Sequence, residues 1–247
     1  MAASKPAIII CIGAWHRPLH YANLITDLET NGFEVHCPPL GSIDNNNTTF
    51  APDVDQIRSL ISRLVSENKD VALLMHSYGG IYGSEAAGPF VKKPGGPGHG
   101  VTKLIYMSAW ALDAGLSVMD LASSQGVLPF WFSRSDDGQF VLRLPDALAM
   151  FYNDLEMEDV VEARKYLGPI GRGAFETKVS FAPWKEVESV YLYCLKDLAV
   201  PTQLQDFFLT QEGGRWKSVT IDSGHSPWIS KRKETCDAVV KAVVDQL

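Results

Sequence analysis

Ser77 follows a continuous apolar run, Val71 to Met75, and is followed closely by Gly79 and Gly80. The run predicts a buried strand, and the small residues leave room for a sharp turn from that strand into a helix. A serine at the tip of such a turn presents its hydroxyl as a nucleophile. Met75 stands where the pattern G-x-S-x-G has its first glycine, and Ser77 could instead cap the following helix. The motif alone therefore leaves both roles open.

A nucleophilic serine needs two partners elsewhere in the chain. A histidine must accept its proton, and a carboxylate must orient that histidine. His225, in the loop sequence DSGHSPW, is the candidate base, and Asp197, just past the apolar stretch SVYLYCL, is the candidate acid. Asp113, after another apolar run, is a competing acid. The alternatives are a helix-capping histidine and a surface-turn aspartate, but together the residues predict acyl transfer by a Ser-His-Asp triad.

Acyl transfer also needs hydrogen-bond donors for the negative charge that develops on the substrate's carbonyl oxygen. The N–H of Tyr78, directly after the candidate nucleophile, is one expected donor. The N–H of Ala14, in the loop sequence IGAWH, is the other. Trp15 and His16 in the same loop are predicted to contact the substrate. His76 precedes the serine, so its side chain should point away from the pocket, and we assign it a packing role.

The elements that must position these residues alternate between apolar strands and amphipathic helices. Strands are expected over residues 7–12, 33–37, 71–75, 101–107, from 189 and over 216–221. Helices are expected over about 18–31, around 54–64, after 77, from 201 and from about 228. This alternation predicts one α/β domain over residues 1–247 with a doubly wound, mainly parallel sheet. Ligands of such sheets bind beyond the carboxyl ends of the strands, where the candidate residues lie.

The alternation stops between about residues 114 and 185, where the chain is rich in aromatic residues and partly helical, as in DALAMFYNDLEMEDVVEARKYL. We expect this segment to form a cap over one end of the sheet. Small-molecule pockets are mostly apolar, and aromatic residues of the cap could supply the walls. The residues predicted to contact substrate are Trp131, Phe132 and Trp184, and further candidates are Phe130, Phe151, Tyr152 and Phe181.

Four stretches, CIGAWHRPLHYANLITDLETNGFEVHCPPLG, LLMHSYGG, LKDLAVPTQLQDFF and SGHSPWIS, resemble the α/β-hydrolase branch that contains methyl-ester esterases and hydroxynitrile lyases. The order serine, acid, histidine is that of α/β-hydrolases. The resemblance covers the core nearly end to end. It implies Ser77 as nucleophile, His225 as base, Asp197 as acid, and the N–H groups of Ala14 and Tyr78 as oxyanion donors.

Two positions depart from this family pattern. Ile12-Gly13 stands where the family often has His-Gly, and Ser226 stands where the lyases have a lysine, which argues against cyanohydrin cleavage. The predicted function is a serine hydrolase that cleaves a carboxylic ester or lactone of a small hydrophobic molecule. The alternative is a lyase, cyclase, isomerase or small-molecule receptor that uses the same pocket.

Composition argues against several other classes. Lys and Arg number 22 against 29 Asp and Glu, and the net charge of −7 disfavours nucleic acid and anionic membranes as partners. No apolar run approaches the ~20 residues of a membrane span. The four cysteines lie far apart without a CxxC pair, which predicts a reducing, cytoplasmic location. We expect no metal and no cofactor, since HExxH, P-loop and strand-linked G-x-G-x-x-G motifs are absent. The expected partner is the small substrate, and a homodimer is allowed.

Overall fold

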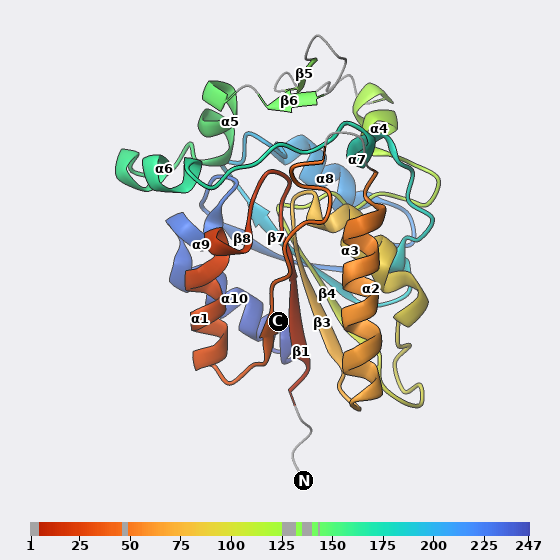
Figure 1. Cartoon of the computed structure of the whole chain (residues 1–247). Helices are drawn as coiled ribbons and strands as arrows, with labels where there is room; N and C mark the ends of the chain where they lie inside the picture. The colour runs from red at the N-terminus through yellow and green to blue at the C-terminus, as the bar shows by residue number, and fades with distance from the viewer. Residues whose placement is uncertain (1–4, 46–48, 125–131, 135–139, 143) are drawn as a thin grey trace.

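The computed structural model describes residues 5–45, 49–124, 132–134, 140–142 and 144–247. Six strands form a parallel sheet in the order β2-β1-β3-β4-β7-β8 (Figure 1). Their bounds are β1 Ala7–Cys11, β2 Val35–His36, β3 Val71–His76, β4 Val101–Met107, β7 Ser189–Cys194 and β8 Trp216–Ile221. Helices cover both faces of this sheet, so the predicted α/β fold is confirmed.

The central strands are apolar throughout because both of their faces are covered. Every residue of β1 and β3 is buried, as expected for parallel strands between two helical layers. Helices α1 (Ala22–Thr30) and α10 (Arg232–Val243) lie on one face, and α2 (Ala51–Ser66) and α3 (Gly79–Ala87) lie on the other (Figure 1). The remaining core helices are η1 Pro18–Tyr21, η2 Gly88–Phe90, α8 Thr202–Thr210 and α9 Pro227–Ser230.

Two of the expected helices are interrupted. The helix expected from Pro18 begins as the 3-10 turn η1 and continues as α1. The closing helix is divided into α9 and α10 at Lys231, whose backbone angles, φ −129° and ψ 46°, are not helical. Strands β4 and β8, by contrast, have the bounds expected from the sequence. The differences fall at helix ends, where local turn geometry outweighs apolar periodicity.

The segment between β4 and β7 covers the end of the sheet at which the strands' carboxyl ends lie (Figure 1). We call residues 114–185 the cap. Its elements are α4 Val118–Ser124, β5 Phe132–Arg134, β6 Phe140–Leu142, α5 Leu144–Phe151, α6 Met157–Arg164, α7 Gly173–Glu176 and η3 Pro183–Lys185. The antiparallel pair β5–β6 was not expected from the sequence. The stretch expected to be partly helical forms two helices, α5 and α6, which residues 152–156 separate.

The returning end of the cap is tied to helix α3. The buried carboxylate of Glu85 accepts hydrogen bonds from the Ser180 backbone N–H at 2.7 Å and from the Ser180 hydroxyl at 2.6 Å. Arg58 of α2 pairs with the same carboxylate at 3.2 Å. A partly buried carboxylate requires such partners. The contacts fix the cap to the helix that begins just after Ser77.

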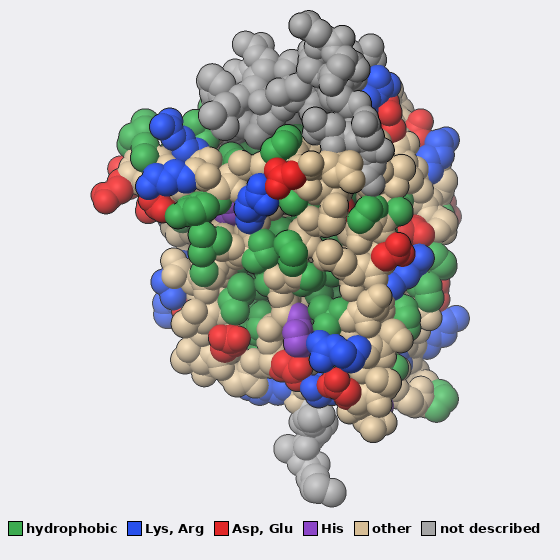
Figure 2. Space-filling model, viewed as in Figure 1, with side chains coloured by type: hydrophobic (Ala, Val, Ile, Leu, Met, Phe, Trp, Pro, Cys, Tyr) green, Lys and Arg blue, Asp and Glu red, His purple; other side chains and the backbone are tan. Residues whose placement is uncertain are grey.

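The outer surface carries both signs of charge. Figure 2 shows acidic and basic side chains interspersed on the face seen there, with apolar side chains gathered below the cap. Leu19 in η1 and Met157 in α6 are among the exposed large apolar residues. Within the described ranges, no helix combines the length and the apolar character needed to cross a bilayer.

Candidate active site

Ser77 lies in a tight turn between β3 and α3. Its φ is 53°, in the left-handed region that non-glycine residues rarely adopt. A Cβ on Gly79 would lie 2.1 Å from the carbonyl oxygen of Cys11, and a Cβ on Gly80 would lie 2.3 Å from that of Trp110. No side chain fits at either position. The expected steric role of the two glycines is therefore confirmed.

Met75 is accommodated although the usual motif has glycine there. In the structure, helix α3 contributes the space, because a Cβ on Gly83 would lie 2.8 Å from the Met75 sulfur. The missing glycine is thus offset by one in the following helix.

Asp197 and His225 form a buried pair at the carboxyl ends of β7 and β8. The Oδ2 atom of Asp197 lies 2.8 Å from Nδ1 of His225. The Oδ1 atom accepts hydrogen bonds from the backbone N–H groups of Ala199 at 2.7 Å and Val200 at 2.9 Å. Ser108, directly after β4, donates its hydroxyl to Oδ2. These donors fix the carboxylate, and the carboxylate fixes the imidazole ring with its proton on Nδ1.

Asp113, the competing acid, faces a different partner. Its carboxylate pairs with Lys185 at 2.6 Å and accepts a hydrogen bond from the Ala114 N–H at 2.8 Å, both on exposed surface. The carboxylate that contacts His225 is therefore that of Asp197.

The second imidazole nitrogen of His225 is positioned to accept a proton. Nε2 is buried and has no hydrogen-bond partner among the described residues. Ser77 lies close by, because the neighbouring His76 donates its Nε2 proton to the His225 carbonyl at 3.1 Å. No hydrogen bond joins the Ser77 hydroxyl to Nε2 in the described part of the chain. Such pairs are often long in unliganded sites and shorten when substrate binds.

The two expected oxyanion donors are uncommitted. Neither the Ala14 N–H nor the Tyr78 N–H donates a hydrogen bond to another described residue. Both follow carboxyl ends of adjacent strands, β1 and β3, which pair in parallel. The Tyr78 side chain is turned into the protein, where its hydroxyl donates to the buried Asp53 carboxylate at 2.7 Å. The backbone N–H groups are thus free to bind a ligand oxygen.

His76 does more than the packing role expected of it. The Gly13 N–H donates to the Tyr21 hydroxyl at 3.0 Å, and this hydroxyl donates to Nδ1 of His76 at 2.7 Å. Through Nε2, His76 then holds the His225 carbonyl. One buried chain of hydrogen bonds therefore connects the loop after β1 with the loop that carries His225. In the sequence, this bridging role of His76 is indicated by a histidine at the end of an otherwise apolar strand.

His16, which the sequence predicts to contact the substrate, has both ring nitrogens hydrogen-bonded within the protein. Its side chain is buried, with Nδ1 donating to the Ala14 carbonyl at 2.8 Å and Nε2 accepting from the Tyr152 hydroxyl at 3.1 Å. Through its bond to the Ala14 carbonyl, His16 holds the loop after β1. Trp15 instead packs against two cap residues, Phe151 and Phe175, with ring centroids 5.6 and 5.4 Å apart. The Phe151 ring lies 5.5 Å from that of His225, so these aromatic rings adjoin the triad.

Trp184 is a core residue rather than a substrate contact. It is fully buried, donates its indole N–H to the Leu112 carbonyl at 3.1 Å, and stacks on Trp216 at 5.6 Å. Trp216 begins β8, at the end of that strand away from the triad. Trp131 and Phe130 lie outside the described residues, and Phe132 is described only as the first residue of β5.

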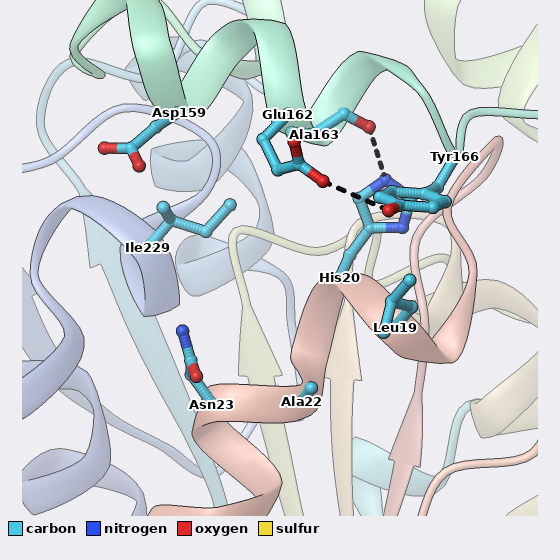
Figure 3. A pocket seen from close by; sticks show the side chains of 9 residues that line it. All are labelled: Leu19, His20, Ala22, Asn23, Asp159, Glu162, Ala163, Tyr166 and Ile229. Carbon is cyan, nitrogen blue, oxygen red and sulfur yellow. Dashed lines mark hydrogen bonds between the residues drawn. The ribbon is translucent and has the colours of Figure 1, made fainter.

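A groove of about 310 Å³ runs along the seam between the cap and the core (Figure 3). It lies among α6, η1, the start of α1 and α9. Its lining residues are Leu19, His20, Ala22, Asn23, Asp159, Glu162, Ala163, Tyr166 and Ile229. His20 spans the seam by donating from Nε2 to the Ala163 carbonyl at 3.0 Å. The triad does not line this groove.

The buried histidines should make stability depend on pH. Burial lowers the pKa of His16 and of His76 well below the ordinary value. The unfolded chain therefore binds protons near pH 6.5 that the folded chain does not. The free energy of unfolding should fall as the pH drops below about 6.5, by about 1.4 kcal/mol per pH unit for each histidine. Chemical denaturation at a series of pH values measures this slope.

The His16→Gln variant should show a shallower slope by about one proton. Equal slopes in wild type and His16→Gln would contradict the prediction.

A sequence profile of the Alpha/beta hydrolase family matches residues 9–238. An alpha/beta hydrolase of Aspergillus novofumigatus, nvfD, is 33% identical over 232 residues, which cover 92% of this chain and 92% of the relative. Methylesterase 7 of Arabidopsis thaliana is 25% identical over 260 residues, covering 96% and 94% of the two chains.

Solved structures show the same fold. Polyneuridine aldehyde esterase has a TM-score of 0.77 at 18% identity and covers 96% of this chain and 99% of its own. A pyrethroid hydrolase from Sphingobium faniae JZ-2 has a TM-score of 0.77 at 20% identity and covers 97% and 98%. The likeness thus extends over cap and core together.

Proposed function

Because the chain belongs to the alpha/beta hydrolase family, we propose that it is a serine hydrolase that cleaves a carboxylic ester or lactone of a small apolar molecule. Family membership confirms the resemblance inferred from the sequence. The observation that carries the proposal is the Asp197–His225 pair at 2.8 Å, whose opposite imidazole nitrogen is buried without a partner among the described residues. An unsatisfied buried acceptor beside a serine in a strained turn is costly for a protein without a catalytic use for it.

The reaction begins with attack of the Ser77 hydroxyl oxygen on the substrate's carbonyl carbon. Nε2 of His225 accepts the hydroxyl proton, and Asp197 stabilises the resulting imidazolium. The negative charge moves to the carbonyl oxygen, which the N–H groups of Ala14 and Tyr78 bind. Collapse of this intermediate breaks the ester bond, and His225 returns the proton to the leaving alcohol. Water, activated by the same histidine, then releases the acid from Ser77.

Aromatic rings next to the His225 imidazole favour an apolar substrate. Trp15, Phe151 and Phe175 pack together, and Phe151 adjoins His225. Flat apolar surface of this kind binds aromatic or alicyclic groups better than charged ones. The names of the relatives, a methylesterase, an aldehyde esterase and a pyrethroid hydrolase, support an ester of such a group.

The wild-type protein should be labelled by a serine-directed fluorophosphonate and should hydrolyse simple aryl esters without added metal. A panel of p-nitrophenyl esters, methyl esters of aromatic acids and small lactones, assayed with and without EDTA, measures this. Turnover should not change with EDTA and should favour apolar acyl groups. No labelling and no turnover would overturn the proposal, whereas labelling without turnover on the whole panel would support the non-hydrolytic alternative.

A further inference from the structure

Three consecutive cap residues contact three separate loops of the candidate site. Tyr152, Asn153 and Asp154 occupy the break between α5 and α6, and we call them the cap clasp. The Tyr152 hydroxyl donates to Nε2 of His16 at 3.1 Å, and His16 in turn holds the Ala14 carbonyl at 2.8 Å. The first clasp residue therefore supports the loop that carries an expected oxyanion donor.

The other two clasp residues hold the acid and base loops. Nδ2 of Asn153 donates to the carbonyl of Lys196 at 2.9 Å, one residue before Asp197. Oδ2 of Asp154 accepts the N–H of Gly224 at 2.6 Å, one residue before His225. The cap thus holds the backbone of the residue directly before each partner of the Asp197–His225 pair.

The fit between the clasp and the base loop is close. A Cβ on Gly224 would lie 2.4 Å from Oδ1 of Asn153 and 2.5 Å from Oδ1 of Asp154. A side chain at position 224 would therefore displace the Asn153 and Asp154 side chains from these positions. The backbone of the base loop and the clasp side chains are therefore in direct contact.

Simple attachment of the cap does not explain these contacts. Oδ1 of Asp154 is buried and has no hydrogen-bond partner among the described residues, which is an unfavourable state for a carboxylate. Asn153 is exposed, so its contact gains little from burial. All three bonds end within two residues of a group that the proposed mechanism uses. A cap held only by packing would have no reason to place its polar contacts there.

We propose that Tyr152, Asn153 and Asp154 are positioning residues that set the geometry of the acid, the base and the oxyanion loop. The inference rests on the proposed function, since it assigns the clasp to the same site. Loss of Asp154 releases the His225 side of the pair, and loss of Asn153 releases the Asp197 side. Because both act on one 2.8 Å contact, their effects should not be additive.

The test compares Asp154→Ala, Asn153→Ala and the double variant with wild type, using Glu158→Ala on the exposed start of α6 as control. For Asp154→Ala, kcat on an aryl ester and the fluorophosphonate labelling rate should both fall at least about tenfold, with KM little changed. Asp154→Asn should recover most of the rate, because its amide oxygen can still accept the Gly224 N–H. Glu158→Ala should match wild type, and melting curves identify any variant that fails to fold.

A spectroscopic readout separates this inference from the proposed function. The proton between His225 Nδ1 and Asp197 should give a downfield NMR signal that is absent in Asp197→Asn. In Asp154→Ala this signal should move upfield or broaden by exchange, whether or not any ester is turned over. An unchanged signal, or unchanged kcat and labelling with only KM raised, overturns the positioning role. A wild type that shows the signal but neither labels nor hydrolyses would instead count against the hydrolase proposal alone.

Discussion

The Ser77→Ala variant should lose ester hydrolysis almost entirely, with kcat lower by about a millionfold. Ser77 supplies the oxygen that first attacks the substrate's carbonyl carbon in the proposed mechanism, so alanine leaves the oxyanion donors and the binding surface without a nucleophile. Fluorophosphonate labelling should disappear at the same time. Steady-state kinetics with p-nitrophenyl esters and mass spectrometry of the labelled peptide measure the two losses.

Folding should not change in this variant. Serine and alanine both carry a Cβ, so the strain of a φ of 53° at position 77 is similar for the two. Ser84→Ala, in the following helix α3, is the matched control, because its hydroxyl contacts Tyr106 at 2.7 Å and takes no part in the proposed reaction. It should keep both labelling and turnover. If the Ser77→Ala variant still yielded a fluorophosphonate-labelled peptide, another residue would be the nucleophile.

The Asp197→Asn variant should lower kcat by about ten-thousandfold. The carboxylate accepts the Nδ1 proton of His225 at 2.8 Å and thereby leaves Nε2 free to accept a proton. An amide can present its own N–H toward Nδ1 instead, which favours the tautomer with the proton on Nε2. That tautomer cannot take a proton from Ser77. The kcat measured with a saturating aryl ester tests the prediction.

Asp113→Asn is the control for this prediction, because Asp113 is the competing acid in the sequence. Asp113 pairs with Lys185 on exposed surface, and such pairs contribute about 0–1 kcal/mol to stability. Its kcat should remain within about twofold of wild type, since the variant does not touch the triad. A larger loss in Asp113→Asn than in Asp197→Asn would reverse the assignment of the acid.

The sheet could be predicted well because its strands are short apolar runs bounded by turn residues. Burial between two helical layers makes such strands nearly uniform in composition, so residues 101–107 and 216–221 matched β4 and β8. The break in the cap could not be read from the apolar period. Within this break, Asn153 and Asp154 bond to loops far away in the sequence. Local sequence patterns do not predict contacts between residues so far apart in the chain.

The candidate site was predicted in part for the same reason. Ser77, Asp197 and His225 could be proposed because each occupies a typical place after a strand, and the structure brings Asp197 and His225 into contact. Ser108, which donates to Asp197, has no motif of its own. Trp184 was assigned to the pocket because it is aromatic and lies in the cap, yet its partner is Trp216 in the core. Residue type indicates what a side chain can do, and only the tertiary fold decides what it faces.

Two opposing effects act on Ser108, the strain of its backbone and the hydrogen bond of its hydroxyl. Its φ of 49° is left-handed, a conformation that glycine adopts without strain but that costs other residues about 1–2 kcal/mol. Its hydroxyl, however, donates to the Asp197 carboxylate. Glycine at position 108 would relieve this strain, but it would also remove a hydrogen bond to a buried carboxylate, which is worth about 1.5–3 kcal/mol. The strained backbone at position 108 is therefore offset by the same hydrogen bond that fixes the Asp197 carboxylate.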